Sequence, residues 1–169
     1  LSNNQRQLYQ LIMTRQADRS QLQNSLQILC TCLYQHYNVK PWLLIDEYDT
    51  PIQSSYLHGY YDEMINFMRG MFGAALKTNP YLEKAVITGI LRIAKESLFS
   101  GLNNLKVYSV LDERYGQYFG FTEEEMDELL QQADLTPHSA EIRKWYNGYQ
   151  FGKTVVYNPW SVANCLNER

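Results

Sequence analysis

The sequence predicts an α/β fold in which a parallel sheet is followed by a small, mainly helical subdomain. Two short apolar runs predict the sheet, Trp42–Ile45 and Ala85–Thr88, and each comes after a segment with helical periodicity. Apolar runs of this length are typical of strands buried on both faces, and alternation of helix and strand is typical of βαβ units. A change of composition near Phe121 predicts the second subdomain. The expected domains are therefore residues 1–120 and residues 121–169.

The helices of the first domain are predicted from start and stop signals. Residues 1–19 are polar and are expected to form a loop or a frayed helix. Ser20 and Gln23 have capping-box spacing and predict a helix start, and Pro41 ends that helix. After a polar loop, apolar residues at helical spacing predict a second helix through residues 64–75.

Beyond the second run, residues 106–110 are a candidate for a third strand. Three helix-start signals then follow, at Thr122, Thr136 and Asn158; Thr122 has the capping-box spacing, and the other two precede proline. Residues 154–157 are expected to form a short strand of a hairpin. The large aromatic residues near the C-terminus, Trp145 and Trp160 among them, are expected to form the core of this subdomain.

Bulk properties exclude several classes of protein. The net charge of −3 gives no general attraction to nucleic acid, so a nucleic-acid partner is possible but not indicated. No apolar stretch is long enough for a membrane span, and no signal peptide is visible. The three cysteines show no metal-binding spacing and are expected to be reduced thiols, which favours a cytoplasmic protein.

The strongest chemical signal is a pair of acids, Asp46 and Glu47, directly after the first apolar run. Ligands of open α/β sheets bind at the carboxyl ends of the strands. Two adjacent carboxylates there repel one another unless a cation is near. The pattern resembles a Walker B motif, in which Asp46 would help to hold Mg²⁺ and Glu47 would polarise the water that attacks ATP.

The surrounding residues carry a wider resemblance. The strings Leu-Leu-Ile-Asp-Glu-Tyr-Asp-Thr-Pro-Ile at 43–52, Ala-Val-Ile-Thr-Gly-Ile-Leu-Arg at 85–92 and Trp-Tyr-Asn-Gly-Tyr at 145–149 occur in this order. Together they resemble the AAA-ATPase-like family, whose P-loop NTPase domain is commonly followed by a PD-(D/E)XK nuclease-like region. The resemblance implies that the chain is the C-terminal part of a P-loop parallel-sheet domain followed by a lid-like subdomain.

The resemblance also implies site residues. Thr88, at the end of the second strand, takes the sensor-1 position, and Arg92 is a candidate for phosphate contact, with Lys95 as the alternative. Each of these three also has an ordinary structural explanation, as a strand-end threonine or a surface cation. Mg²⁺ and ATP are expected in the full-length protein, and neither is expected on this chain by itself. Self-association and the nuclease-like region are the expected partners, and a membrane is not.

A phosphate-binding loop is missing from the sequence. The segment from Gly148 to Thr154 has three residues between its glycines where a Walker A loop has four, and it follows a predicted helix. The Walker A loop is expected upstream of Leu1. No lysine has an acid two residues before it, as a PD-(D/E)XK nuclease needs. The main hypothesis is an ATPase fragment that is not competent alone; the alternative is a non-catalytic module that binds a protein or nucleic acid.

Overall fold

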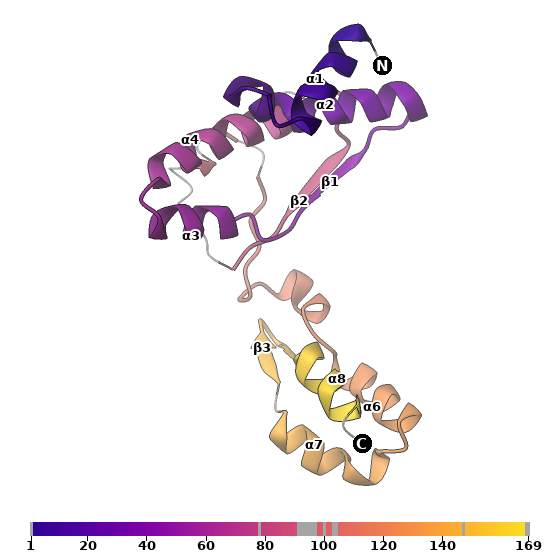
Figure 1. The fold of residues 1–169 in the computed structure, drawn as a ribbon. Helices are drawn as coiled ribbons and strands as arrows, with labels where there is room; N and C mark the ends of the chain where they lie inside the picture. The colour runs from indigo at the N-terminus through magenta and orange to yellow at the C-terminus, as the bar shows by residue number, and fades with distance from the viewer. Residues whose placement is uncertain are drawn as a thin grey trace. The chain divides into compact units, whose positions relative to one another are not determined.

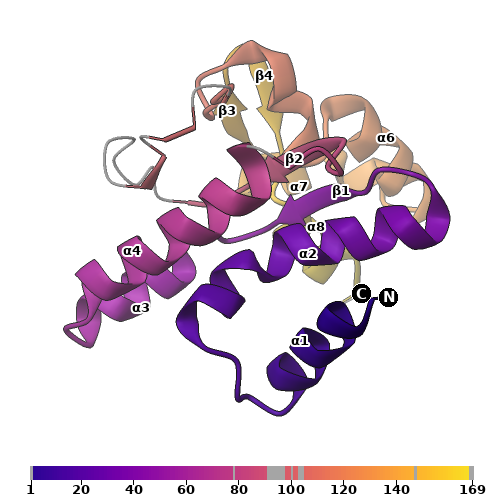
Figure 2. The ribbon, with the colours of Figure 1, turned by 90° about the horizontal axis from the view of Figure 1, so that it is seen from above.

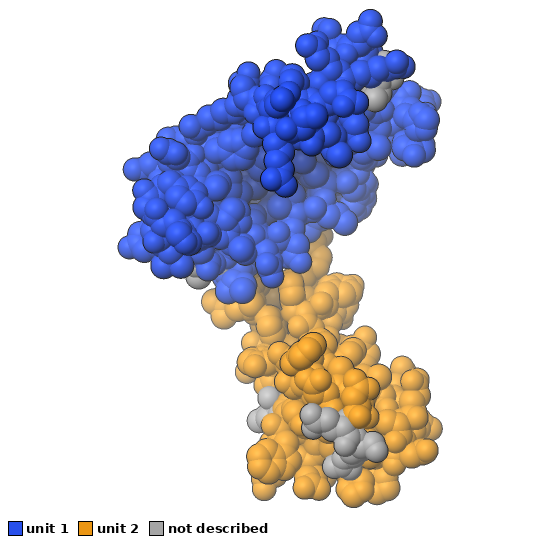
Figure 3. Space-filling view, in the orientation of Figure 1, with its two compact units in different colours: residues 1–105 blue, residues 106–169 orange. Residues whose placement is uncertain are grey.

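The chain folds into two compact units, residues 1–105 and residues 106–169 (Figures 1 and 3). The computed structural model describes residues 2–77, 79–90, 98–99, 101–102, 105–146 and 148–167. The division lies before the boundary at 120/121 that we expect from composition, because a short 3-10 helix, η2 (Glu113–Tyr118), packs on the C-terminal hairpin. The functional assignment of the two parts as NTPase core and lid stays a prediction.

The first unit combines helices with a two-stranded sheet. Its elements are α1 (Asn3–Met13), α2 (Arg19–Tyr37), β1 (Trp42–Ile45), α3 (Thr50–Leu57), α4 (Tyr61–Phe72), the π-helical turn η1 (Gly73–Lys77) and β2 (Lys84–Ile87). Helix α4 lies beside α2, and α3 lies beside α4 (Figure 2). The core of the unit is made of buried apolar side chains, namely Ile52, Ile65, Met68, Phe72, Leu98 and Leu102.

Two helices of this unit begin at signals other than those expected. Residues 3–13 form α1, which Ser2 caps. Helix α2 starts after Asp18, which makes a reciprocal capping box with Gln21, so the predicted cap, Ser20, is wrong by two residues. The carboxylate of Asp18 is a charged acceptor at a helix N-terminus, which the helix dipole favours. The polar loop expected after β1 instead contains α3, because Pro51 fits the first helical turn.

Strands β1 and β2 pair in parallel, from Trp42 opposite Lys84 to Ile45 opposite Ile87. The predicted parallel pairing is therefore confirmed. The prediction that these strands are buried on both faces is wrong: Leu44 and Val86, neighbours in register, are 71% and 48% exposed. The opposite face carries Ile45, which packs against the core. Within the described residues, the face that carries Leu44 and Val86 is therefore largely exposed.

The second unit is a small helical cluster with one hairpin. Its elements are η2, α6 (Glu123–Gln132), the 3-10 turn η3 (Thr136–His138), α7 (Ser139–Trp145), β3 (Tyr149–Phe151), β4 (Thr154–Val156) and α8 (Pro159–Asn167). Strands β3 and β4 are antiparallel, and Phe121 forms an isolated bridge with Tyr157. The core contains Met126, Leu130, Leu135, Ile142, Tyr157 and Val162.

Sequence signals are largely confirmed in this unit. Thr122 and Glu125 form the expected capping box of α6, and the Asn158 side chain accepts a hydrogen bond from the Ser161 N–H at the start of α8. The third strand expected at 106–110 is wrong. Its end is taken into a turn in which Ser109 donates twice to the Asp112 carboxylate, so this segment is not extended against a partner.

The large aromatic residues are only partly in the core. Trp145 and Trp160 are each 77% exposed, so the prediction that they form the core of the second unit is wrong. On the same two short helices, α7 and α8, it is Ile142 and Val162 that are buried in the core. No helix among the described residues is long and apolar enough to cross a membrane.

Candidate functional site

The ends of the two parallel strands bring Asp46 and Thr88 together. The residues that follow β1 and β2 lie at the same edge of the sheet, because the strands are parallel and in register. The Thr88 N–H donates to the Ile45 carbonyl at 2.9 Å, which extends the ladder by one residue. The Thr88 hydroxyl then donates to Oδ1 of Asp46. The expected neighbourhood of these two side chains is therefore present, while their roles stay predictions.

Glu47 occupies an unusual backbone conformation beside them. Its φ is 51°, in the left-handed region that residues other than glycine rarely adopt. The Glu47 N–H donates to Asp46 Oδ1 at 2.9 Å, and Oε2 lies 3.4 Å from the Thr50 hydroxyl. This turn sends the Glu47 side chain into solvent, where it is exposed. Strained backbone of this kind is concentrated at functional sites.

The Asp46 carboxylate has capacity for a cation. Both hydrogen bonds that it accepts from described residues end on Oδ1, so none of these residues occupies the lone pairs of Oδ2. Mg²⁺ is bound through one or two carboxylates together with waters and phosphate oxygens. The described residues contain no group of three or more His, Cys, Asp or Glu side chains that could hold a metal. Asp46 therefore fits a Mg²⁺ ion that takes its other oxygen ligands from water and nucleotide.

A third acid of the same turn was not predicted as a site residue. Asp49 is 1% exposed, although it lies three residues after the exposed Asp46. Its Oδ2 accepts a hydrogen bond from the Ile90 N–H at 3.2 Å and from the Gln53 side chain at 3.1 Å. In the sequence, Asp49 looks like an ordinary helix cap before Thr50 and Pro51. The structure shows no side-chain capping bond there.

The other predicted phosphate contacts cannot be placed. Arg92 and Lys95 lie outside the described residues. Of the four predicted site residues, Asp46, Glu47, Thr88 and Arg92, the structure therefore positions the first three.

Family membership follows from comparison with known sequences. Residues 1–99, which include both strands and the whole Asp46–Thr88 edge, match the model of the AAA-ATPase-like family, described as a predicted AAA-ATPase. The chain belongs to the AAA-ATPase-like family. The acidic turn and the threonine-bearing strand end are thus parts of an AAA-ATPase-like sequence.

One curated relative extends the match beyond the family model. This AAA-ATPase-like chain is 34% identical over 128 residues to a protein of Azotobacter chroococcum mcd 1 described as an uncharacterized protein in the vnfD 5′ region. The aligned part is 75% of this chain and 25% of that protein, so the chain spans about a quarter of its relative's length. No solved structure matches the chain.

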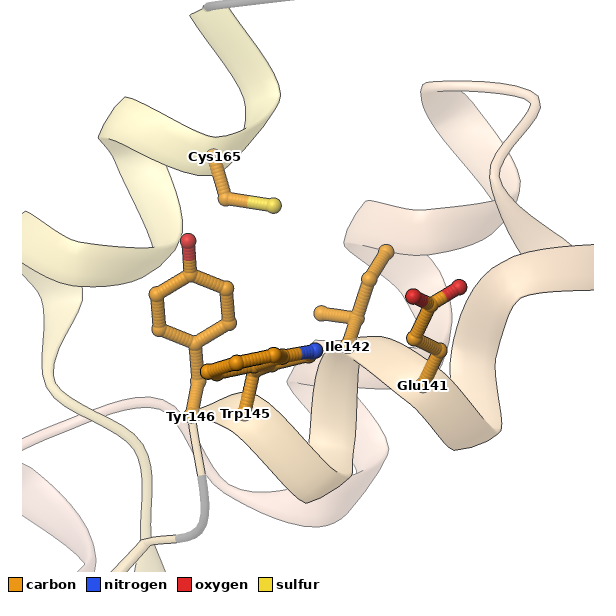
Figure 4. A pocket seen from close by; sticks show the side chains of 5 residues that line it. All are labelled: Glu141, Ile142, Trp145, Tyr146 and Cys165. Carbon is orange, nitrogen blue, oxygen red and sulfur yellow. The ribbon is translucent and has the colours of Figure 1, made fainter.

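A separate pocket lies in the second unit of this AAA-ATPase-like chain. Its volume is about 230 Å³, and Figure 4 shows its lining: Glu141, Ile142, Trp145 and Tyr146 from α7 and its end, and Cys165 from α8. Cys165 is half-buried, and its side chain points into the space between Tyr146 and Ile142 (Figure 4). The five lining residues include no lysine, arginine or histidine, so they offer no cation for a phosphate. This pocket therefore does not explain nucleotide chemistry.

The carboxylates of the second unit are engaged in an ion-pair network. Arg143 Nε lies 2.9 Å from Glu123 Oε2, and Arg143 Nη2 lies 2.7 Å from Asp127 Oδ1. These bonds, chiefly the one that Arg143 donates to Asp127, raise the pKa of Arg143 above its already high value. The Tyr157 hydroxyl donates to Glu123 at 2.6 Å, and burial together with this bond raises the pKa of Tyr157. This cluster joins α6 to α7 and to Tyr157, the residue after β4, and its role is structural.

Proposed function

We propose that this chain supplies the Walker B and sensor-1 elements of an Mg-ATP-hydrolysing P-loop domain. The observation that supports this most strongly is the hydrogen bond between Thr88 and Asp46 across neighbouring strand ends of an AAA-ATPase-like chain. Acids at the carboxyl edge of a parallel sheet lie where such folds bind ligands. In this proposal β1 and β2 are two adjacent strands of a larger parallel sheet, and residues 121–169 belong to its lid.

Each site residue then has a task that its environment suits. Asp46, with Oδ2 open, would hold Mg²⁺ directly or through water. When bound, the ion would neutralise charge on the nucleotide phosphates. Glu47, exposed on its strained turn, orients the attacking water and accepts its proton. Thr88 shares its hydroxyl between Asp46 and the attacking water or γ-phosphate, and Arg92 contacts phosphate.

The proposal also divides labour between this chain and the rest of the protein. Phosphate binding in P-loop enzymes comes chiefly from the backbone amides and the lysine of the Walker A loop. The sequence has no such loop, so the chain alone does not bind or hydrolyse ATP, while the full-length protein does both. Self-association and a nuclease-like region of the full-length protein are the proposed partners.

The test is made on the full-length protein with calorimetry and a phosphate-release assay. Glu47→Gln should leave the Kd for Mg-ATP nearly unchanged and lower kcat by about 10²–10⁴-fold, the scale of a positioned base. Asp46→Ala should weaken nucleotide binding in the presence of Mg²⁺ and have little effect without it. Glu63→Gln, which removes an exposed charge from the first turn of α4, is the matched control and should change neither quantity.

Three results would count against the proposal. Full activity of Glu47→Gln would remove Glu47 from the mechanism. Micromolar binding of Mg-ATP by the isolated chain would mean that it holds a phosphate site of its own. A full-length protein that neither binds nor hydrolyses ATP would favour the alternative, a non-catalytic interaction module.

A further inference from the structure

We infer that Asp49 is a positioning residue that locks the acidic turn after β1 to the backbone after β2. The inference rests on the proposed function, because the groups that it positions are Asp46, Glu47 and Thr88. Asp49 itself is buried and does not face solvent, so it acts through these neighbours and not on a substrate.

The lock consists of hydrogen bonds that cross from one strand end to the other. The Tyr48 N–H donates to the Thr88 carbonyl at 3.1 Å. Two residues further on, the Ile90 N–H donates to Asp49 Oδ2 at 3.2 Å. Together with the hydroxyl bond from Thr88 to Asp46, three residues of the first segment, Asp46, Tyr48 and Asp49, are tied to the segment after β2. A bond from a backbone N–H to an ionised carboxylate is stronger than a neutral one, above all where water is excluded.

Gly89 shows how closely the two segments approach. A Cβ atom at this position would lie 2.6 Å from Asp49 Oδ1 and 2.7 Å from the Tyr48 ring. Such distances are far below van der Waals contact, and both contacted groups are packed in place. The absence of a side chain at Gly89 therefore allows the Asp49 carboxylate to reach the Ile90 N–H.

The other end of the lock is fixed in the core. Asp49 is the residue before α3, and Gln53, one turn later, donates to the same carboxylate oxygen. Between them Ile52 is 2% exposed and belongs to the core of the first unit. The position of the Asp49 carboxylate is thus set by a helix that cannot shift without disturbing the core. The strained turn at Glu47 lies between this anchor and β1, which limits its motion at both ends.

The consequence concerns kcat more than binding. A displacement of about 1 Å of a catalytic group can cost about 10²-fold in rate. In the full-length protein, Asp49→Ala should therefore lower kcat by about 10²-fold and change the Kd for Mg-ATP by less than about threefold. Asp49→Asn should retain activity to within about tenfold, because its amide oxygen can take the place of Oδ2 and still accept from both Ile90 and Gln53.

The experiment combines these rates with amide hydrogen exchange at Thr88 and Ile90, measured by NMR on the same full-length variants. Exchange at Ile90 should accelerate in Asp49→Ala and stay slow in Asp49→Asn. Ser55→Ala is the matched control: Ser55 is also fully buried, on the same helix, and donates to the Ile52 carbonyl away from the site. It should leave both kcat and the exchange at Ile90 unchanged.

The results separate this inference from the proposed function. If the wild-type protein hydrolyses no ATP, the proposed function fails, and unchanged exchange at Ile90 in Asp49→Ala would overturn the lock as well. If Asp49→Ala does not fold, Gly89→Ala decides, because the added methyl group displaces the carboxylate. A Gly89→Ala enzyme with wild-type kcat, or an Asp49→Ala effect no larger than that of Ser55→Ala, would contradict the inference.

Discussion

The acidic turn after β1 and the ion-pair network of the second unit both contain aspartate and glutamate, but these carboxylates have different partners in the two regions. In the second unit, Glu123 and Asp127 both bind Arg143. At the end of β1, Asp46 and Glu47 accept hydrogen bonds from N–H and hydroxyl groups, and no lysine or arginine among the described residues forms an ion pair with either. Carboxylates paired with a resident cation hold a structure together, whereas those left without one can take a cation from a ligand.

The backbone conformation also differs between the two regions. Thr122 has ordinary extended angles and satisfies the first turn of α6 through a capping box. Glu47 is held at a positive φ. Asp49, at the corresponding place before α3, accepts from the Ile90 N–H and the Gln53 side chain and makes no capping bond to the helix backbone. One region is arranged for stability and the other accepts a cost in stability to hold side chains in place.

The largest expected effect comes from removing Glu123. Glu123→Ala takes away one Arg143 contact and leaves the buried Tyr157 hydroxyl without this acceptor, at a cost of about 2 kcal/mol in the free energy of unfolding. Chemical denaturation of the second unit measures it. Glu124→Ala, the next residue in the same helical turn, should cost less than about 0.5 kcal/mol. Equal effects of the two substitutions would show that the network contributes little.

A smaller effect of opposite sign is expected at the acidic turn. Glu47→Gly should raise the free energy of unfolding by about 0.5 kcal/mol, because glycine adopts the left-handed conformation without strain. The same variant should be as inactive as Glu47→Gln. As a control, Glu63→Gly within helix α4 should be destabilising by about 1 kcal/mol. A destabilised Glu47→Gly protein would contradict the view that this turn is strained.

The smallest effect concerns pH. Burial and the bond to Glu123 raise the pKa of Tyr157 in the folded state. Below about pH 10 the phenol is protonated in both states, so its contribution to stability is complete. As the pH rises further, the unfolded chain ionises first and stability falls until the folded pKa is passed. Tyr157→Phe should remove this part of the slope in alkaline denaturation, while Tyr149→Phe, at an exposed position, should keep it.

These differences also explain what the sequence could and could not predict. The apolar runs predicted the parallel strands and therefore the meeting of Asp46 with Thr88, because parallel strands place their carboxyl ends at one edge. The capping signal at Thr122 is local and was read correctly. Asp49 was missed because its partner, the Ile90 N–H, is distant in sequence, and a buried acid before a helix has the same local pattern as a cap.

The exposure of the sheet was missed for a related reason. An apolar run predicts that both faces of a strand are buried in the complete fold. It does not say whether the residues that bury them belong to the same stretch of chain. Leu44 and Val86 fit the expected pattern of a central strand, and yet both are at the surface of the described structure. Similarly, residues 106–110 have strand-like composition, but the hydrogen bond from Ser109 to Asp112 closes a turn at the end of this segment and no strand forms there.

The parallel pairing has a consequence for folding. Trp42 meets Lys84 only after the chain between them, with helices α3 and α4, has closed a long loop. Loop closure of this kind is slow compared with helix formation, so the strands spend time with unpaired backbone and exposed apolar side chains. Even after pairing, Leu44 and Val86 remain accessible to other molecules. We therefore expect production of this unit by itself to be limited by solubility before it is limited by stability.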